Sequence, residues 1–110
     1  MECVFCKIIR GEMASKKIAE NDTLIVIQDI FPKAPVHYLI IPKKHTQDIQ
    51  SLPLENLNIA TDIFAIAQHL SEKIEGARDF KLHVNSGKNA GQIVMHLHVH
   101  FIAGNLTGAL

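Results

Sequence analysis

The pattern of hydrophobic and polar residues changes several times along this 110-residue chain, and each change predicts a different element. Two short stretches rich in strand-forming residues, 17–20 and 23–28, flank the turn residues Asn21 and Asp22. This arrangement predicts a β-hairpin. A third strand is predicted over residues 37–41, after a segment that contains two prolines. Proline lacks the backbone donor that strand pairing needs, so we expect this strand to begin only after that segment.

The longest periodic stretch runs over residues 53–74 and predicts a helix. Its apolar positions recur every three or four residues, which is the spacing of one helical face: Leu57, Ala60, Phe64, Ala67, Leu70 and Ile74. Pro53 suits an early helical position, and Gly76 suits a position just after the end. Three isoleucines lie outside this stripe, and we expect them to pack against a second copy of the chain: Ile59, Ile63 and Ile66.

Two further strands are predicted over residues 80–85 and 96–101, joined by a loop at 86–92. A short helical segment around residues 5–9, ended by Gly11, precedes the hairpin. This layout predicts an α+β fold, in which one antiparallel five-stranded sheet carries the long helix on one face. We expect a single domain over all 110 residues, because a chain of this size builds one core.

Three histidines occupy alternate positions of the last predicted strand. Side chains alternate between the two faces of a strand, so His96, His98 and His100 share one face. The residues between them can meet the helix, which leaves the imidazoles facing outward: Leu97, Val99 and Phe101. Neighbours on one face lie about 7 Å apart, so their charges oppose one another and at least one imidazole should be neutral at pH 7. A neutral imidazole can act as nucleophile, general base or metal ligand, whereas a solvated His-rich face would have no chemical role.

The loop before this strand combines residues suited to anion binding. Gly87 and Gly91 permit backbone conformations that other residues rarely adopt, and successive N–H groups in such a turn can surround a phosphate. The side-chain amide of Asn85 offers a further donor nearby. An ordinary connection between strands would use the same glycines, so the loop taken alone leaves both interpretations open.

Charge and composition narrow the class of partner. Eleven basic side chains balance eleven acidic ones, so bulk charge predicts neither nucleic-acid nor membrane binding. No apolar run approaches the roughly 18 residues that span a bilayer, and the N-terminus lacks a secretory pattern, so we expect a cytoplasmic protein. In that reducing compartment, the C-x-x-C motif of Cys3 and Cys6 favours metal or redox chemistry over a structural disulfide.

Three blocks of the chain together resemble the histidine triad (HIT) family, in particular its branch of nucleoside phosphoramidate hydrolases. The blocks are CVFCKIIRGE, VIQDIFPKAPVHYLIIPKKH and VNSGKNAGQIVMHLHVHFIAG, and the last is the most specific. The resemblance implies a two-fold homodimer, formed through the long helix and the adjoining strand, that binds a purine nucleotide in each protomer. It also implies hydrolysis of adenosine 5′-phosphoramidate and related compounds, in which a histidine attacks the α-phosphate and carries a covalent nucleotidyl intermediate.

The same resemblance assigns roles to individual residues. His98 matches the nucleophile, His100 matches a donor to the phosphate or leaving group, and His37 matches a further histidine of the site. Asp29 would accept hydrogen bonds from the ribose hydroxyls, and the backbone of residues 91–93 would hold the phosphate. The residues matched to nucleotide binding, besides the two triad histidines, are Val4, Phe5, Ile27, Asp29, Ile30, Asn85, Gly91, Gln92 and Ile93.

Bacterial-type members of this family carry zinc on the C-x-x-C motif and two histidines. In this chain the corresponding residues are Cys3, Cys6, His45 and His96, which would form a closed tetrahedral site with a structural role. The chemistry itself would need no metal. A pair of free or oxidisable thiols is the competing interpretation.

Other functions remain open at the level of the sequence. A zinc hydrolase would use the three alternate histidines as ligands, although their positions spread them along the strand. A dinucleoside polyphosphate hydrolase would share the same site. A nucleotide-binding interaction protein with vestigial activity would fit Ile93, because this position is commonly polar in the resembled branch. Among the remaining histidines, we expect His69 on the helix surface and His83 in a structural role.

Overall fold

The computed structural model describes residues 3–106. Within that range, none of the helices has the length and apolar character that a membrane crossing requires. The elements confirm the predicted α+β fold, with five strands, one long helix and a short N-terminal helix. In chain order they are α1 (Val4–Ile9), β1 (Lys17–Glu20), β2 (Leu24–Gln28), β3 (Val36–Pro42), the 3-10 helix η1 (Leu54–Asn56), α2 (Asn58–Lys73), β4 (Phe80–His83), the 3-10 helix η2 (Lys88–Ala90) and β5 (Val99–Ala103).

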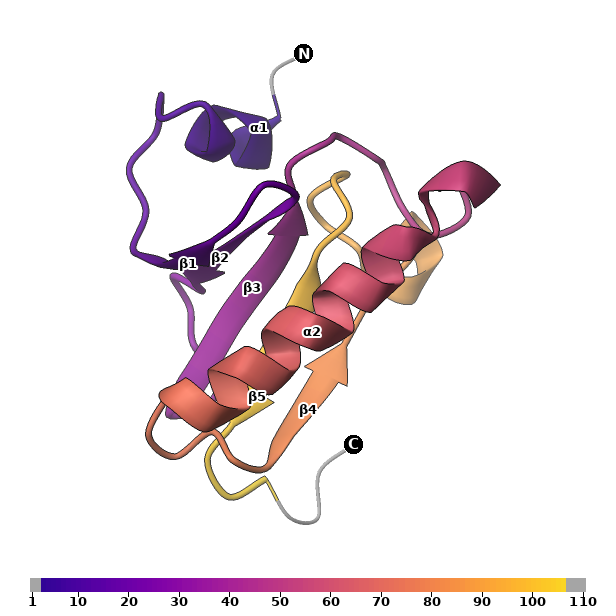
Figure 1. Ribbon diagram of the computed structural model, residues 1–110. Coiled ribbons are helices and arrows are strands. Elements are labelled where there is room, and N and C mark those ends of the chain that lie inside the picture. Colours follow the sequence, from indigo (N-terminus) through magenta and orange to yellow (C-terminus); the bar gives the residue numbers. More distant parts are fainter. Residues whose placement is uncertain (1–2, 107–110) are drawn as a thin grey trace.

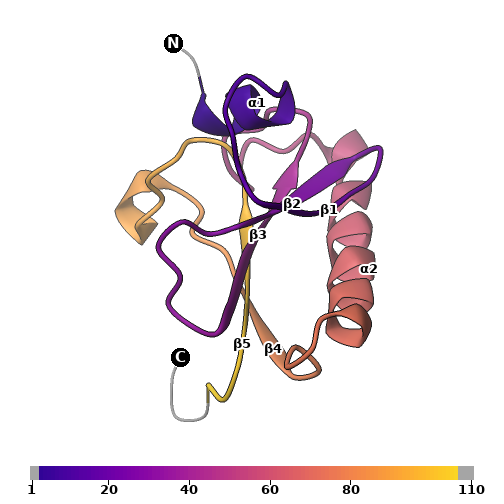
Figure 2. The same cartoon turned by 90° about the vertical axis from the view of Figure 1, so that its left-hand side faces the viewer.

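The strands form one antiparallel sheet in the order β1-β2-β3-β5-β4 (Figure 1). β5 is therefore an inner strand, because Ile40 of β3 pairs with Val99 on one side and His83 of β4 pairs with His100 on the other. Figure 2 views the sheet nearly edge-on, with α2 along one face and the loop that contains η2 on the other side. His100, the histidine of β5, therefore lies between the two neighbouring strands β3 and β4.

Two apolar clusters hold these layers together. β2 contributes to both, since Leu24 and Val26 face α2, while Ile25 and Ile27 face the opposite side. On the α2 side the buried helix residues are Ile63, Ile66, Ala67 and Leu70. On the other side, Phe5 of α1 packs with the remaining cluster residues, which are Ile25, Ile27, Leu39 and Ile41. Both faces of the central strands are consequently covered.

The predicted helix begins later than expected and buries a different stripe. Pro53 has an extended backbone, with φ −61° and ψ 145°, so it precedes η1 and is not a residue of α2. Ile63 and Ile66 are each only 7% exposed and belong to the core beneath the helix, so their predicted place outside the core stripe is wrong. Phe64, which was placed on the core stripe, is 66% exposed. The helix α2 has two overlapping apolar stripes. The sheet covers the stripe that contains Ile63 and Ile66, and it leaves Phe64 exposed.

The last predicted strand also begins later. β5 starts at Val99, so His96 and His98 lie in the segment that leads into it. The main chain there is still tied to the fold, because the N–H of Leu97 donates to the carbonyl of Thr46 at 2.7 Å. The alternation of faces is confirmed for Val99 and Phe101, which both belong to the cluster beneath α2.

Candidate active site

Two of the three triad imidazoles are buried, so the expectation that they face outward is wrong for His96 and His98. His96 is completely buried, and His98 is 9% exposed. The ring of Phe5 lies edge-on to both, with ring centroids 5.8 Å from His96 and 5.1 Å from His98. The short helix α1 folds over this face of the sheet, which alternation along a strand cannot predict.

The backbone fixes which nitrogen of His98 carries the proton. Nδ1 of His98 lies 2.8 Å from the carbonyl oxygen of His96. A carbonyl oxygen only accepts hydrogen bonds, so Nδ1 must carry the hydrogen and donate it. In the neutral ring, Nε2 then holds the lone pair. His98 is thus held in the tautomer that a nucleophile attacking through Nε2 needs.

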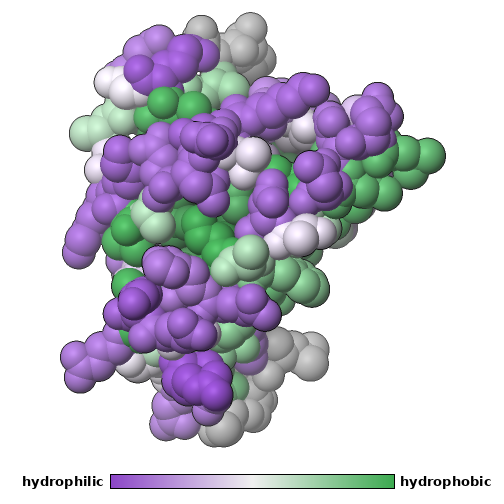
Figure 3. Space-filling view, in the orientation of Figure 1, coloured by the Kyte–Doolittle hydropathy of each residue, from purple (hydrophilic) through white to green (hydrophobic). Residues whose placement is uncertain are grey.

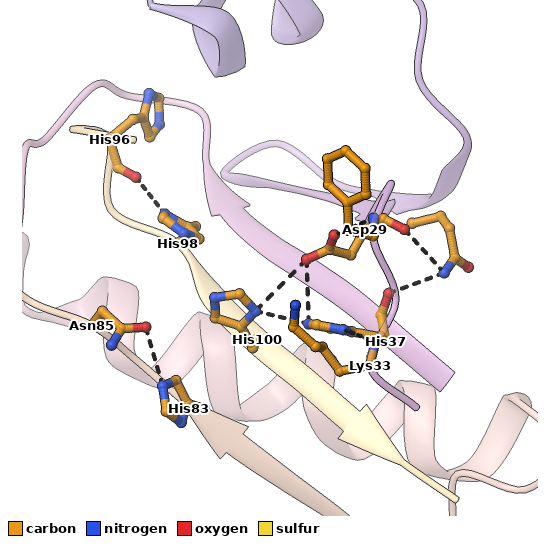
Figure 4. Close-up of polar contacts among 10 residues, drawn as sticks. Asp29, Lys33, His37, His83, Asn85, His96, His98 and His100 are labelled. Carbon is orange, nitrogen blue, oxygen red and sulfur yellow. Dashed lines mark hydrogen bonds and ion pairs between the residues drawn. The ribbon is translucent and has the colours of Figure 1, made fainter. Parts of the chain in front are cut away.

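A second chain of contacts fixes the protons of His37 and His100 (Figure 4). The backbone N–H of Lys33 donates to Nδ1 of His37 at 2.9 Å, so the hydrogen of the neutral His37 ring is on Nε2. That Nε2 lies 2.9 Å from Nδ1 of His100 and donates to it. His100 therefore carries its own hydrogen on Nε2, where it can serve as a donor. One backbone amide sets the tautomers of two imidazoles.

Asp29 closes this network from the loop after β2. Its Oδ1 accepts from the N–H of Phe31 at 2.8 Å, which holds the carboxylate in a turn. Its Oδ2 lies 3.3 Å from Nε2 of His37 and 3.9 Å from Nδ1 of His100. The backbone N–H of Asp29 donates to the carbonyl of His37 at 3.0 Å. The carboxylate predicted to hold a ribose is thus anchored beside the imidazole pair.

Burial keeps this pair neutral. Desolvation lowers the pKa of His37, although the carboxylate of Asp29 acts in the opposite direction. Desolvation, followed by repulsion from His98 and His37, lowers the pKa of His100 to about 4. At neutral pH, His100 therefore acts as a neutral hydrogen-bond donor, in keeping with the expectation that at least one imidazole is uncharged.

A cavity of about 290 Å³ brings most of the predicted site residues together. Phe31, Lys33 and Val94 belong to it and were missed by the sequence analysis. Phe31 and Lys33 lie in the chain between Asp29 and His37, two predicted site residues. Their position in the sequence could therefore have indicated that they also line the site. The lining residues are Asp29, Phe31, Lys33, His37, Asn85, Gly91, Gln92, Ile93, Val94, His98 and His100.

Four of the residues matched to nucleotide binding do not line this cavity within the described chain: Val4, Phe5, Ile27 and Ile30. Phe5 and Ile27 are buried in the smaller apolar cluster, and Val4 packs against that cluster. Ile30 is 81% exposed. Phe5 still contacts the site through the ring of His98.

The loop around η2 is held from within by a buried glutamine. Gln92 is 4% exposed, and its Oε1 accepts from the N–H of Gly87 at 2.7 Å. Its Nε2 donates to the carbonyls of Gln47 and Val94. Gly91 has φ 92°, a backbone conformation that favours glycine, and its N–H donates to Lys88. The side chain of Gln92 therefore shapes the loop.

The cysteine motif and two histidines form a second cluster, which includes the first histidine of the triad. The donor atoms of Cys3, Cys6, His45 and His96 all lie within 4.8 Å of one another. Nδ1 of His96 lies 3.3 Å and 3.6 Å from the two sulfurs, and Nδ1 of His45 lies 3.3 Å from that of Cys6. These separations match the sulfur–nitrogen edge of a tetrahedral zinc site, about 3.5 Å for ordinary zinc–ligand distances.

The orientation of His96 supports the same interpretation. Its Nε2 lies 2.7 Å from the carbonyl of Pro42 and must donate to it, so Nδ1 presents a lone pair to the two sulfurs. Two thiols and two imidazole nitrogens are a donor set that can hold a metal ion. His96 therefore belongs both to the triad and to the cluster with Cys3, Cys6 and His45.

The triad itself does not assemble as one ligand set in the described residues. His96 belongs to the cysteine cluster, whereas His100 groups with Asp29 and His37. In that second group, Nε2 of His37 carries a hydrogen, because Lys33 donates to its Nδ1. A nitrogen that bears hydrogen has no lone pair for a metal. The contacts thus disfavour a catalytic metal held by the three alternate histidines.

An antiparallel sheet with paired imidazoles beside a glycine-containing loop defines a small α+β protein with a histidine-based site. The sequence profile of the HIT domain family matches residues 10–106, and the chain therefore belongs to the HIT family. This confirms the resemblance found in the sequence.

Solved structures and a named relative agree with this assignment. A HIT family hydrolase from Clostridium thermocellum superposes with a TM-score of 0.92 at 41% identity, covering 98% of this chain and 95% of that one. A zinc-bound histidine triad protein from Mycobacterium smegmatis gives 0.83 at 34% identity, covering 100% and 81%. The protein named adenylylsulfatase HINT3, from Arabidopsis thaliana, is 38% identical over 101 residues, which cover 92% of this chain and 51% of that protein.

Partial burial of the neutral His100 ring should make the free energy of unfolding depend on pH. The unfolded chain takes up this proton near pH 6.5, the ordinary histidine pKa, and the folded protein only near pH 4. Between these values the unfolded state binds more protons, so the free energy of unfolding should fall as the pH is lowered. We expect His100→Asn to reduce this slope in denaturant unfolding at several pH values. His69→Asn, at an exposed position of α2, is the control; an unchanged slope for His100→Asn would contradict a buried neutral ring.

Proposed function

We propose that this protein hydrolyses purine nucleoside 5′-phosphoramidates through a covalent nucleotidyl intermediate on His98. One observation carries the proposal: the tautomers of two imidazoles in the cavity, those of His98 and His100, are fixed in complementary forms. The His96 carbonyl leaves a lone pair on Nε2 of His98. The chain from Lys33 through His37 leaves a hydrogen on Nε2 of His100. The ring centroids of His98 and His100 are 5.3 Å apart.

This pair suits an in-line substitution at phosphorus. In the first step, Nε2 of His98 would bond to the α-phosphorus, and the P–N bond would break with its electron pair remaining on the nitrogen, which takes up a proton from water and departs as a neutral amine. His100 would donate a hydrogen bond to the phosphoryl group as charge develops there. In the second step, water would attack the same phosphorus and lose a proton to solvent, the nucleotide would be released, and the bonding pair would return to Nε2 of His98.

The bound nucleotide would be held from two sides. Asp29 is anchored so that its carboxylate faces the cavity beside His37, which suits acceptance of ribose hydroxyl hydrogens. Asn85 and the loop around η2 lie on the same cavity, where amide donors suit phosphate oxygens. The amides of Gly91 and Gln92 already donate within the loop, to Lys88 and Gly87. Of the three predicted phosphate-binding amides, that of Ile93 is the one without an acceptor among the described residues.

A second candidate reaction is the hydrolysis of adenylyl sulfate. It is favoured by the relative named adenylylsulfatase HINT3. The same nucleophile would attack the same phosphorus, and only the leaving group would differ. Dinucleoside polyphosphates are a third class of substrate for this site. Rates measured on all three classes with one enzyme preparation would rank them, and nucleotide binding without turnover of any would leave a binding role.

We also propose that the Cys3, Cys6, His45 and His96 cluster holds a structural zinc ion. The donor set and its spacing support this, as does the zinc-bound relative from Mycobacterium smegmatis. Zinc there would stabilise the attachment of α1 to the sheet. The reaction needs no metal in this scheme, because His98 is activated by a backbone contact.

The protein is further proposed to act as a homodimer through the exposed face of α2. An apolar cavity of about 240 Å³ lies on this face, between Phe64 of α2 and Val84 after β4. Apolar surface gathers around the beginning of α2 in Figure 3. Leu97 and Val99, which flank His98 in the sequence, line the same cavity. A second copy packed here would cover the exposed Phe64 and support the segment that carries His98.

Replacing His98 with alanine should abolish turnover of adenosine 5′-phosphoramidate. The loss should be at least about 10³-fold in kcat, because the nucleophile itself is removed. Release of the nucleotide would be followed by chromatography at pH 7 in excess chelator, and folding by circular dichroism. His69→Ala, which alters an exposed histidine of α2, should keep wild-type activity. A folded His98→Ala protein that retains activity would refute the nucleophile.

Replacing Cys3 and Cys6 with serine should remove bound zinc. Metal analysis of the purified protein should find about one zinc ion per chain in the wild type and none in the variant. A strong chelator should lower the Tm of the wild type and leave that of the variant unchanged. Zinc retained by the double variant would show that the metal is held elsewhere.

Replacing Phe64 with glutamate should disrupt the dimer. A charge buried in an apolar interface is strongly unfavourable, so sedimentation equilibrium should report a monomer at concentrations where the wild type is a dimer. Gln68→Glu adds the same charge at another exposed position of α2 and should leave the dimer intact. A wild type that is monomeric at all concentrations would refute this interface.

A further inference from the structure

His83 makes a contact that the proposed reaction does not yet use. It ends β4 and is exposed, and its Nε2 lies 3.1 Å from Oδ1 of Asn85. The other end of the same amide, Nδ2 of Asn85, donates to the carbonyl of Ala90 at 2.7 Å. Figure 4 shows the His83 and Asn85 side chains turned toward each other. The amide is therefore held at both ends.

These partners determine the orientation of the amide. The carbonyl of Ala90 can only accept, so the nitrogen of the Asn85 amide must face it and the oxygen must face His83. His83 must then carry a hydrogen on Nε2 and donate it. If the amide turned over, its oxygen would lie against the oxygen of Ala90. His83 and Ala90 thus select one orientation of Asn85 together.

The oriented amide lies beside the candidate reaction centre. Asn85 lines the cavity with His98 and His100. A Cβ atom at Gly91 would be 3.3 Å from Nδ2 of Asn85, so the amide packs closely on the loop around η2. β4 also pairs His83 directly with His100, and the two rings lie edge to face with centroids 5.6 Å apart.

We propose that His83 is a positioning residue, which orients the amide of Asn85 toward the phosphate group of the substrate. One N–H of that amide is used on Ala90, and the second is presented to the cavity. The inference rests on the proposed function, since it assigns the oriented N–H to a phosphoryl oxygen. It also changes the role expected for His83 from a structural one to support of substrate binding and turnover.

The test compares two replacements of His83 that differ in one property. His83→Gln keeps an N–H donor within reach of Asn85, whereas His83→Leu keeps the bulk and removes the donor. For adenosine 5′-phosphoramidate, kcat/KM should fall roughly five- to tenfold in His83→Leu, which is the effect of one lost hydrogen bond. It should return to within about threefold of wild type in His83→Gln. His69→Leu, at an exposed site on α2, should have no effect.

A double-variant cycle with Asn85→Ala separates positioning from general stability. If His83 acts through Asn85, adding His83→Leu to Asn85→Ala should cause no further loss of kcat/KM. Additive losses would overturn the inference, as would equal losses in His83→Leu and His83→Gln.

Two measurements that do not need turnover test the role of His83 independently of the proposed hydrolase activity. The side-chain amide of Asn85 gives its own NMR signals, and AMP binding gives a Kd by calorimetry. His83→Leu should shift those signals and raise the Kd for AMP, and His83→Gln should largely restore both. If the wild type turned over no phosphoramidate while these changes appeared, the hydrolase assignment would fail and the role of His83 would stand. An unchanged amide signal and Kd in His83→Leu would overturn it.

Discussion

The hydrogen bond from Nδ1 of His98 to the carbonyl of His96 is the contact on which the candidate chemistry depends. A carbonyl oxygen can only accept a hydrogen bond, so this contact fixes the hydrogen of the buried His98 ring on Nδ1. That carbonyl is itself immobilised, because the side chain of His96 is completely buried and bonded to Pro42. The ring of His96 also faces the two cysteines. One residue thereby links the attachment of α1, the end of β3 and the candidate nucleophile.

The same logic recurs at each imidazole of the site. Lys33 fixes His37 with a backbone N–H, His37 fixes His100, and His83 is fixed by the amide of Asn85. Each ring is given one tautomer by a chain of contacts that begins at a backbone N–H or carbonyl, whose donor or acceptor character cannot change. A set of histidines in water would exchange among tautomers and charge states. Here burial and these contacts select one arrangement before a substrate arrives, which reduces the reorganisation that a reaction must overcome.

The sequence was sufficient for the elements of the fold and for most of the residues gathered in the cavity, because period and motif are local properties. Burial of His96 and His98 could not be predicted, since it depends on α1 folding over from ninety residues away. The stripe of α2 that meets the sheet was also misjudged: Ile63 and Phe64 are adjacent and both apolar, and only tertiary packing decides between them. The proton positions likewise depend on backbone partners that no spacing rule identifies.

β5 is the strand latest in the described sequence, yet it lies between β3 and β4. The sheet cannot be completed from its N-terminal portion alone, because a gap would remain where the longest strand should pair. During synthesis, the edge of β3 that pairs with β5 must therefore stay unpaired until residues 99–103 have left the ribosome. Contacts so distant in sequence make folding slower and expose an apolar edge to other chains. This protein is therefore most prone to misassembly in the period between the synthesis of β3 and the synthesis of β5.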